Sequence, residues 1–165
     1  LLNPFPSRVL GHPQRQLATA SANYVEGREL TTPQGIAIDR SGATPILYVA
    51  DTGNNRVLAW RNPLNAANGA PADLIIGQRN RFSTTPNGPG TTFTTGLNQP
   101  TGLAVDAQGN LFVADTNNNR ILRYPRPFDQ PSGQLLEIDV MLGQETFGSA
   151  SGGNTGRQPN RGRTS

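Results

Sequence analysis

The residues that could do chemistry are concentrated in two short turns of nearly the same composition. Residues 51–56 read DTGNNR and residues 115–120 read DTNNNR, so each turn places a carboxylate five positions before a guanidinium. Asn, Asp and Gly tolerate the positive φ of tight reversals, and their short side chains bond the turn's own backbone. We therefore predict two Asn-rich hairpins with a structural role. Their predicted turn and blade-contact positions are Asp51, Asn54, Asn55, Arg56, Asp115, Asn118, Asn119 and Arg120.

Metal binding or general-base catalysis would need His, Asp or Glu side chains that converge. The single histidine, His12, stands in a motif position that glutamine fills in two later copies, so we interpret it as a polar turn residue. Residues 115–119 resemble the start of a calcium loop, but Arg120 replaces the expected glycine and Arg126 the closing glutamate. We predict no catalytic residue, no metal and no cofactor within these residues.

Two further carboxylates, Asp39 and Asp106, end equivalent predicted strands. In one interpretation they face a central channel and form part of an acidic ring for a cation or a polar ligand. In the other, which we favour, each caps its own turn.

The charge pattern is a weaker signal for nucleic acid. All 14 basic residues are arginine, the net charge is +3, and part of the excess lies at Arg157, Arg161 and Arg163. Arg79 and Arg81 lie beside Phe82, and arginine interleaved with aromatic residues can bind single strands. Because the basic residues are sparse and irregularly spaced, we expect no nucleic-acid partner and interpret this region as soluble loop.

Composition limits the class of protein further. With no cysteine, the chain can form neither a disulfide nor a thiolate metal site. No apolar run approaches the roughly 20 residues that span a bilayer, so we expect no membrane span. An arginine-only sequence with loops rich in Asn, Thr and Gly favours a bacterial source with a GC-rich genome, and we expect an extracellular or periplasmic location.

An internal repeat organises the rest of the chain. Residues 33–60 align with residues 100–124, and a Gly-Gln or Gly-His marker recurs with its glycines 66 residues apart, at Gly11, Gly77 and Gly143. Each unit contains four short segments rich in Val, Ile, Leu or aromatic residues and bounded by turn residues, as strands are. The predicted strands are 34–39, 46–51, 56–61 and 73–77, then 101–106, 111–115, 120–124 and 138–143.

Four short consecutive strands in each repeat are typical of one blade of a β-propeller. Segments such as 47–50 and 57–60 are apolar without alternation, which predicts sheets buried on both faces, as stacked blades are. The fold class is therefore predicted to be all-β, with two complete four-stranded antiparallel blades and an extra outer strand at residues 7–11.

The motif P-x-G-[IL]-A-[IV]-D followed by L-[YF]-V-A-D-T-x-N-N-R resembles the NHL repeat, over about residues 31–62 and 98–125. The resemblance implies a propeller of six or a similar number of blades. It also implies that Asp51, Arg56, Asp115 and Arg120 brace the turn and the blade contact. The repeats here are longer than is usual in the family, and the excess lies in loops at 79–98 and 145–165.

The expected organisation follows from this repeat. Residues 1–12 supply an outer strand of a preceding or neighbouring blade, 13–78 and 79–144 form two blades with long leading loops, and 145–165 form a Gly/Arg-rich loop or tail. Two blades cannot close a ring, so we interpret the chain as a fragment of a longer propeller or as a self-assembling short one.

The expected function is a non-catalytic binding or structural scaffold, with protein or self-association through blade faces and edge strands, or a glycan, as partner. The alternatives are a piece of a propeller lyase or lactonase whose catalytic residues lie outside this chain, and an RNA-binding NHL propeller.

Overall fold

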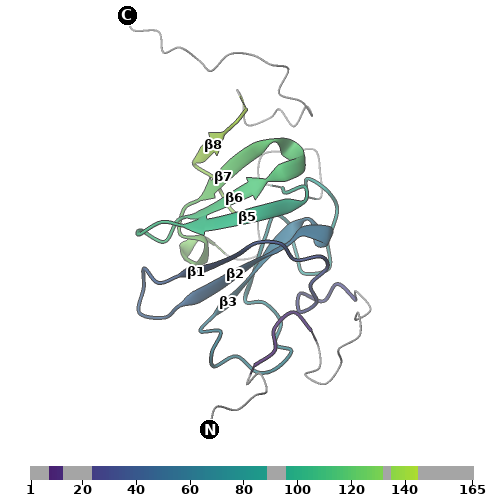
Figure 1. Ribbon diagram of the computed structural model, residues 1–165, viewed down its shortest axis with the longest axis vertical. Helices are drawn as coiled ribbons and strands as arrows, with labels where there is room; N and C mark the ends of the chain where they lie inside the picture. Colours follow the sequence, from purple (N-terminus) through teal and green to yellow (C-terminus); the bar gives the residue numbers. More distant parts are fainter. Residues whose placement is uncertain (1–7, 13–23, 89–95, 132–134, 145–165) are drawn as a thin grey trace, which may run out of the picture.

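The computed structural model describes residues 8–12, 24–88, 96–131 and 135–144, and it folds them into two antiparallel sheets of four strands. Each sheet is a meander in which consecutive strands pair, in the orders β1-β2-β3-β4 and β5-β6-β7-β8. We call the sheets blade 1 and blade 2. Figure 1 shows blade 1 in blue and blade 2 in green, stacked with β1 and β5 as neighbours. The predicted all-β fold of two four-stranded blades is confirmed, and the two sheets do not close into a ring.

The observed strands lie within a residue or two of the predicted ones. Short, punctuated apolar segments of this kind leave little freedom in where a strand starts and ends. Blade 1 comprises β1 Ile36–Asp39, β2 Ile46–Asp51, β3 Arg56–Arg61 and β4 Leu74–Ile76; blade 2 comprises β5 Pro100–Val105, β6 Leu111–Asp115, β7 Arg120–Tyr124 and β8 Val140–Leu142. Three 3-10 turns accompany them: η1 Thr52–Asn54, η2 Thr116–Asn118 and η3 Pro127–Asp129.

The hydrophobic core lies between the two blades. Blade 1 contributes one face of β2, β3 and β4, and blade 2 contributes the opposing face of β5, β6 and β7. Burial of this apolar area is the main force that holds the blades together. The buried members of the core are Tyr48, Val57, Ala59, Ile76, Leu97, Leu111, Val113, Leu122, Tyr124 and Leu136.

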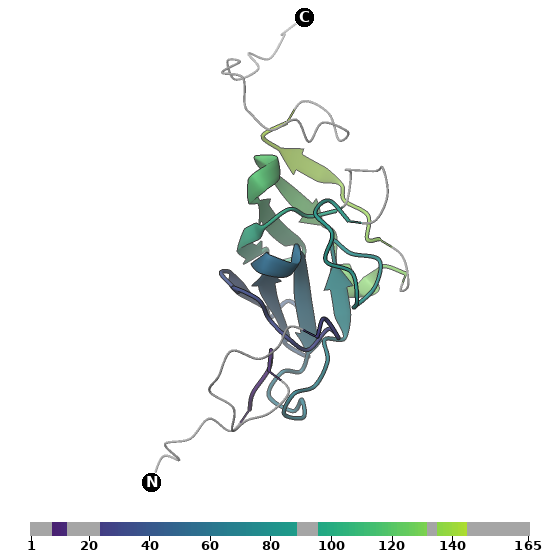
Figure 2. The same cartoon turned by 90° about the vertical axis from the view of Figure 1, so that its right-hand side faces the viewer.

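The two blades differ in how their outer strands are buried. In β3 the consecutive residues from Arg56 to Trp60 are all buried, as the absence of alternation predicts. In β7 burial alternates, and Ile121 is 40% exposed although its sequence neighbours are buried. Blade 2 covers one face of β3, and residues outside the strands help to cover the other, where Trp60 Nε1 donates to the Ala70 carbonyl at 3.0 Å. Among the described residues, the outer face of β7 has no such cover. Figure 2 shows the two blades after a turn of 90° from the view of Figure 1.

Residues 8–12 form no strand, although an outer strand was predicted at residues 7–11. A strand needs a hydrogen-bonded partner strand, and the described residues offer none at this position. The segment is nevertheless held in place, since Leu30 N–H donates to the Gly11 carbonyl at 3.1 Å and Gly69 N–H to the Val9 carbonyl at 3.0 Å. Its assignment to a preceding or neighbouring blade stays a prediction, and the predicted tail at 145–165 lies outside the described residues.

No helix among the described residues has the length and apolarity that a membrane crossing requires.

Candidate functional site

The first Asp–Arg turn is a buried ion pair at the junction of β2 and β3. Arg56 Nε donates to Asp51 Oδ2 at 2.7 Å, and both side chains are fully buried. The chain reverses between them through η1, and Asn55 closes the turn in the left-handed region at φ 54°, which asparagine tolerates. A buried charge is tolerated in this way only when it is paired and hydrogen-bonded.

The same pair also ties the turn to segments far from it in sequence. Asp51 Oδ1 accepts from Thr31 N–H at 2.6 Å, and Asp51 Oδ2 accepts from Asn54 Nδ2 at 2.9 Å. The Arg56 guanidinium donates to the carbonyls of Arg81, at 2.6 Å, and Glu29, at 3.3 Å. The turn therefore joins the segment that leads into blade 1 to the loop that leaves blade 1. The polar groups of the Asp51–Arg56 pair are used in hydrogen bonds that hold the fold together.

Blade 2 repeats the arrangement almost atom for atom. Arg120 Nε donates to Asp115 Oδ2 at 2.7 Å, and Asn118 Nδ2 donates to the same oxygen at 2.7 Å. Asp115 Oδ1 accepts from Asn98 N–H at 2.7 Å, as Asp51 accepts from residue 31. The repetition differs at Arg120 Nη1, which is buried and has no hydrogen-bond partner among the described residues.

The Gly-Gln marker also acquires a structural role that the sequence alone does not reveal. Gln78 is 2% exposed, and its Nε2 donates to the carbonyls of Asn55, at 3.0 Å, and Thr85, at 2.8 Å. Gln144 Nε2 likewise donates to the Asn118 carbonyl at 3.0 Å. The recurrence of glutamine directly after the recurring glycine indicated that the position matters. Its hydrogen-bond partners could not be predicted, because they are backbone carbonyls, which every residue type has.

Two side chains of the first turn bind blade 2 directly. Asn55 Oδ1 accepts from Gln99 N–H at 2.9 Å, and Thr52 Oγ1 donates to the Pro100 carbonyl at 2.6 Å. Their equivalents in blade 2, Thr116 and Asn119, are exposed. The turn is thus a contact between blades where a second blade is present, and a solvent-facing polar group where none is.

The other two predicted positions, Asp39 and Asp106, each accept hydrogen bonds within their own turn. Asp39 is 5% exposed and accepts from Ser41 N–H at 2.7 Å. Asp106 accepts from the backbone N–H groups of Gln108 and Asn110, at 3.0 and 2.9 Å, and from Asn110 Nδ2 at 2.8 Å. Both carboxylates thus bond their own turns, and their position at a channel stays a prediction.

These bonds have a measurable consequence for Asp106. Hydrogen bonds from the Asn110 side chain and from the Asn110 and Gln108 backbone hold the pKa of the Asp106 carboxyl below its usual range. The bonds therefore stabilise the fold at pH above the ordinary aspartate pKa, and this contribution is lost as the pH falls through the lowered value.

Asn110→Ala should raise the Asp106 pKa towards that of a free aspartate in a carboxyl ¹³C NMR titration. Gln108→Ala, which keeps the backbone donor, should leave it unchanged; equal shifts would refute the assignment.

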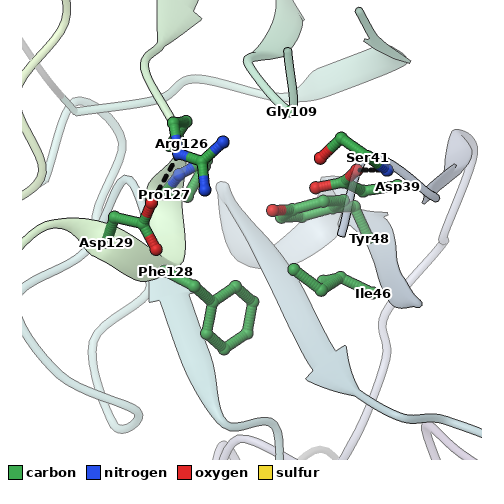
Figure 3. Close-up of a pocket in the computed structure, with 9 residues that line it drawn as sticks. All are labelled: Asp39, Ser41, Ile46, Tyr48, Gly109, Arg126, Pro127, Phe128 and Asp129. Atoms are coloured by element: carbon green, nitrogen blue, oxygen red, sulfur yellow. Dashed lines mark hydrogen bonds and ion pairs between the residues drawn. The ribbon is translucent and has the colours of Figure 1, made fainter. Parts of the chain in front are cut away.

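A small cavity lies between the blades at the end opposite the Asp–Arg turns (Figure 3). Its volume of about 40 Å³ leaves room for a few water molecules. Tyr48 Oη is buried in it without a hydrogen-bond partner among the described residues, and burial raises the pKa of this phenol well above its usual value. Across the cavity Arg126 pairs with Asp129 at 2.5 Å. The cavity lies at the seam between the blades and is too small for an organic substrate. No group of three or more His, Asp or Glu side chains able to hold a metal ion occurs in the described ranges.

Exposed apolar side chains occur on both outer faces of the blade pair. On blade 2, Ile121 and Leu142 lie opposite each other in the register and are 40% and 52% exposed. They stand at the repeat positions of Val57 and Ile76, which are fully buried between the blades. The outer face of blade 2 thus repeats the face of blade 1 that blade 2 covers.

The outer face of blade 1 shows the converse. Ile36 and Ile38 in β1 are 66% and 47% exposed. Their equivalents in β5 are Leu103 and Val105, which pack against the core. The chain therefore presents parts of both halves of its own internal interface, one at each side; on the blade 1 side Leu58 and Trp60 of β3 are already buried, and β1 is exposed. We call the blade 1 surface around Ile36 and Ile38 the head face and the blade 2 surface around Ile121 and Leu142 the tail face.

The fold and its bracing turns define a pair of β-propeller blades. The family model described as the NHL repeat matches residues 97–124, which comprise β5, β6, η2 and β7. The resemblance of the sequence to the NHL-repeat family is thereby confirmed. Teneurin-3 of Danio rerio is similar to this chain, with 29% identity over 124 residues that cover 71% of this chain. The chain spans about 5% of the length of that relative.

Proposed function

We propose that the chain is a non-catalytic binding or structural scaffold module whose blade faces take up further blades, in a larger propeller or by self-association. The observation that carries this proposal is the tail face, where residues that are buried in blade 1 recur exposed at the same repeat positions. Contiguous exposed apolar surface of this kind marks interaction sites on soluble proteins. The NHL match supports a module of the propeller type, whose members work through loops and faces on a rigid scaffold.

The polar groups of the tail face support the same conclusion. Thr116 and Asn119 have the positions of Thr52 and Asn55, which bind the chain leading into blade 2. Because both kinds of contact recur, the expected partner is a sheet that presents a blade-like edge rather than a shapeless apolar surface. An extracellular or periplasmic location remains part of the proposal, and fractionation of the source cells tests it.

A tandem fusion of two copies tests whether the faces bind blades. In the fusion, the tail face of the first copy lies close to the head face of the second, so their effective concentration is high. The two faces can then bind even if separate chains associate only weakly. The fusion is expected to melt about 5–10 °C above the single chain in calorimetry, because each kcal/mol moves the melting temperature of a domain this size by about 2–4 °C.

The matched control is a fusion with Gly102→Ala in its first copy. Among the described residues, a Cβ at residue 102 would meet the Ala114 Cβ at 3.3 Å, a contact that a shift of a few tenths of an ångström relieves, so we expect the fold to be kept. The equivalent Gly35 lies against the Thr101 carbonyl of the next blade, where a Cβ would overlap it. This fusion is expected to melt like the single chain. If the unsubstituted tandem fusion also melts at the temperature of the single chain, the proposal is contradicted.

A further inference from the structure

Residues 8–12 lie against blade 1 in the way that the end of β4 lies against blade 2. In blade 1 a Cβ at Gly77 would meet the Leu97 side chain at 2.7 Å, and at Gly11 a Cβ would overlap the equivalent Leu30 side chain. Both glycines have the same left-handed backbone, with φ of 82° at Gly11 and 87° at Gly77. The segment therefore occupies the place that the outer strand of a preceding blade would take.

The third copy of this marker ends the tail face. Gly143 follows β8 and has a φ of 96°, in the same region as the other two. Leu142 beside it is half exposed and packs against no further blade in the part of the chain that the structure describes. Since β8 and residues 8–11 share one repeat position, both fit the same acceptor place beside Leu30.

We propose that the tail face docks on the head face of a second copy of this chain, and that residues 8–12 of that copy are a plug that β8 of the first must displace. This inference rests on the proposed function and identifies its partner. The template for the contact is the internal interface between blades 1 and 2, whose two halves recur in the tail face and in the exposed β1 part of the head face. A heterologous contact of this kind builds chains or closed rings rather than a symmetric dimer.

Hydrogen-bonding groups at the two faces match as well as the apolar ones. In the internal interface Asn55 accepts from the N–H of Gln99, whose φ is 49°. The equivalent residue at the head face is Thr32, which is exposed and has nearly the same φ, 47°. In the docked pair Asn119 would accept from Thr32 N–H, and Thr116 would donate to the Pro33 carbonyl.

One difference between the two repeats weakens the proposed contact between tail face and head face. Arg123 stands on the tail face where blade 1 has Ala59, and it forms two hydrogen bonds with Asp139, at 2.8 and 2.6 Å. In blade 1 the equivalent of Asp139 is Asp73, which accepts from the backbone N–H of Arg61. The residue equivalent to Arg61 in blade 2 is Pro125, and proline has no N–H to donate to Asp139. Docking removes water from this ion pair, which opposes association. The plug opposes it too, so wild-type association is expected only at high concentration.

The first test removes the plug without touching either face. Gly11→Ala introduces a Cβ that overlaps Leu30 and strains a left-handed backbone, so residues 8–12 are expected to leave their place. If the plug holds most copies closed, the variant should associate about tenfold more tightly, or more, in sedimentation velocity. A Gly11→Ala protein that remains monomeric at millimolar concentration, or associates no better than the wild type, overturns the proposal.

The second test asks whether the contact joins head to tail, with Gly11→Ala as background. Gly102→Ala disables the tail face and Ile38→Asp the head face, where Ile38 is already exposed. Each variant alone is expected to be monomeric. An equimolar mixture should give a one-to-one dimer and nothing larger, because one intact head and one intact tail remain. Phe82→Asp, an exposed residue outside both faces, should associate like the background.

The outcomes separate this inference from the proposed function. A mixture that stays monomeric while the background associates shows that the contact is not head to tail and overturns the inference. If no variant associates in trans but the tandem fusion is stabilised, blade faces bind blades and the partner is not a second copy. If the tandem is not stabilised either, the proposed function fails as well.

Discussion

Asp51→Ala is expected to destabilise the fold by about 3–5 kcal/mol, because it leaves the Arg56 guanidinium buried and without its carboxylate. The variant also removes the acceptor of Thr31 N–H and of Asn54 Nδ2. A domain of this size is stable by only about 5–15 kcal/mol, so the loss is a large share of the total. Urea unfolding followed by circular dichroism measures it.

The matched control is the Arg123–Asp139 pair, whose N–O distance is as short but whose side chains are 30% and 43% exposed. In the native protein Arg123 holds the pKa of Asp139 below its usual range, yet water screens an exposed pair. Arg123→Ala is therefore expected to lower the urea midpoint far less than Asp51→Ala does. Equal losses of stability at the two sites would contradict the conclusion that the Asp51–Arg56 pair braces the fold because it is buried. Should Asp51→Ala fail to fold, Asp51→Asn keeps the volume and one acceptor, and its loss should be smaller but still exceed that of Arg123→Ala.

The second large effect is expected at Gly35, the glycine of the first P-x-G motif. A Cβ there would overlap the Thr101 carbonyl oxygen, which belongs to the backbone of β5 and cannot rotate away. Gly35→Ala must therefore separate the inner strands of the two blades, at an expected cost of about 3 kcal/mol, at the upper end of overpacked substitutions. The same urea titration measures the loss.

Gly102 supplies the control, since it occupies the same position in the second motif but faces no following blade. Gly102→Ala should be neutral or slightly stabilising in the single chain, because alanine reduces the freedom of the unfolded chain. A loss at residue 102 as large as at residue 35 would show that the glycine serves the strand itself and not the approach of a neighbouring blade.

Most of the fold could be predicted because its signals are local. Val, Ile and Leu runs of four to six residues, each closed by Gly, Pro, Asn or Asp, locate all eight strands, and the 66-residue spacing of Gly11, Gly77 and Gly143 sets the repeat. The strand at residues 7–11 was the exception, because a strand also requires a partner that its own sequence does not report.

The candidate site was predictable in its members but not in its contacts. Asp51 and Arg56 lie five residues apart, so their pairing is a local event that the turn already suggests. The bond between Asn55 and Gln99 spans 44 residues, and the acceptor that Arg56 finds at residue 81 is a backbone carbonyl. Neither leaves a mark in residue types.

Asp39 and Asp106 show the same limit from another side. They are equivalent in the repeat, yet only Asp39 is buried. The β5–β6 turn covers it, and a Cβ at Gly109 would lie 3.2 Å from Asp39 Oδ2. Burial here depends on which blade has a neighbour, and a single repeat does not contain that information.

The meander order of the strands also bears on how the chain folds. Every strand pairs with its sequence neighbour, so the ladders of each blade close short loops, whereas a contact such as Thr52 with Pro100 spans 48 residues. Closing short loops costs less chain entropy and proceeds faster. Hairpins should therefore form first within each blade, and the docking of β5 on β1 should be the late step. In a transition-state study, substitutions in the β2–β3 hairpin would slow folding, and Gly35→Ala would mainly speed unfolding.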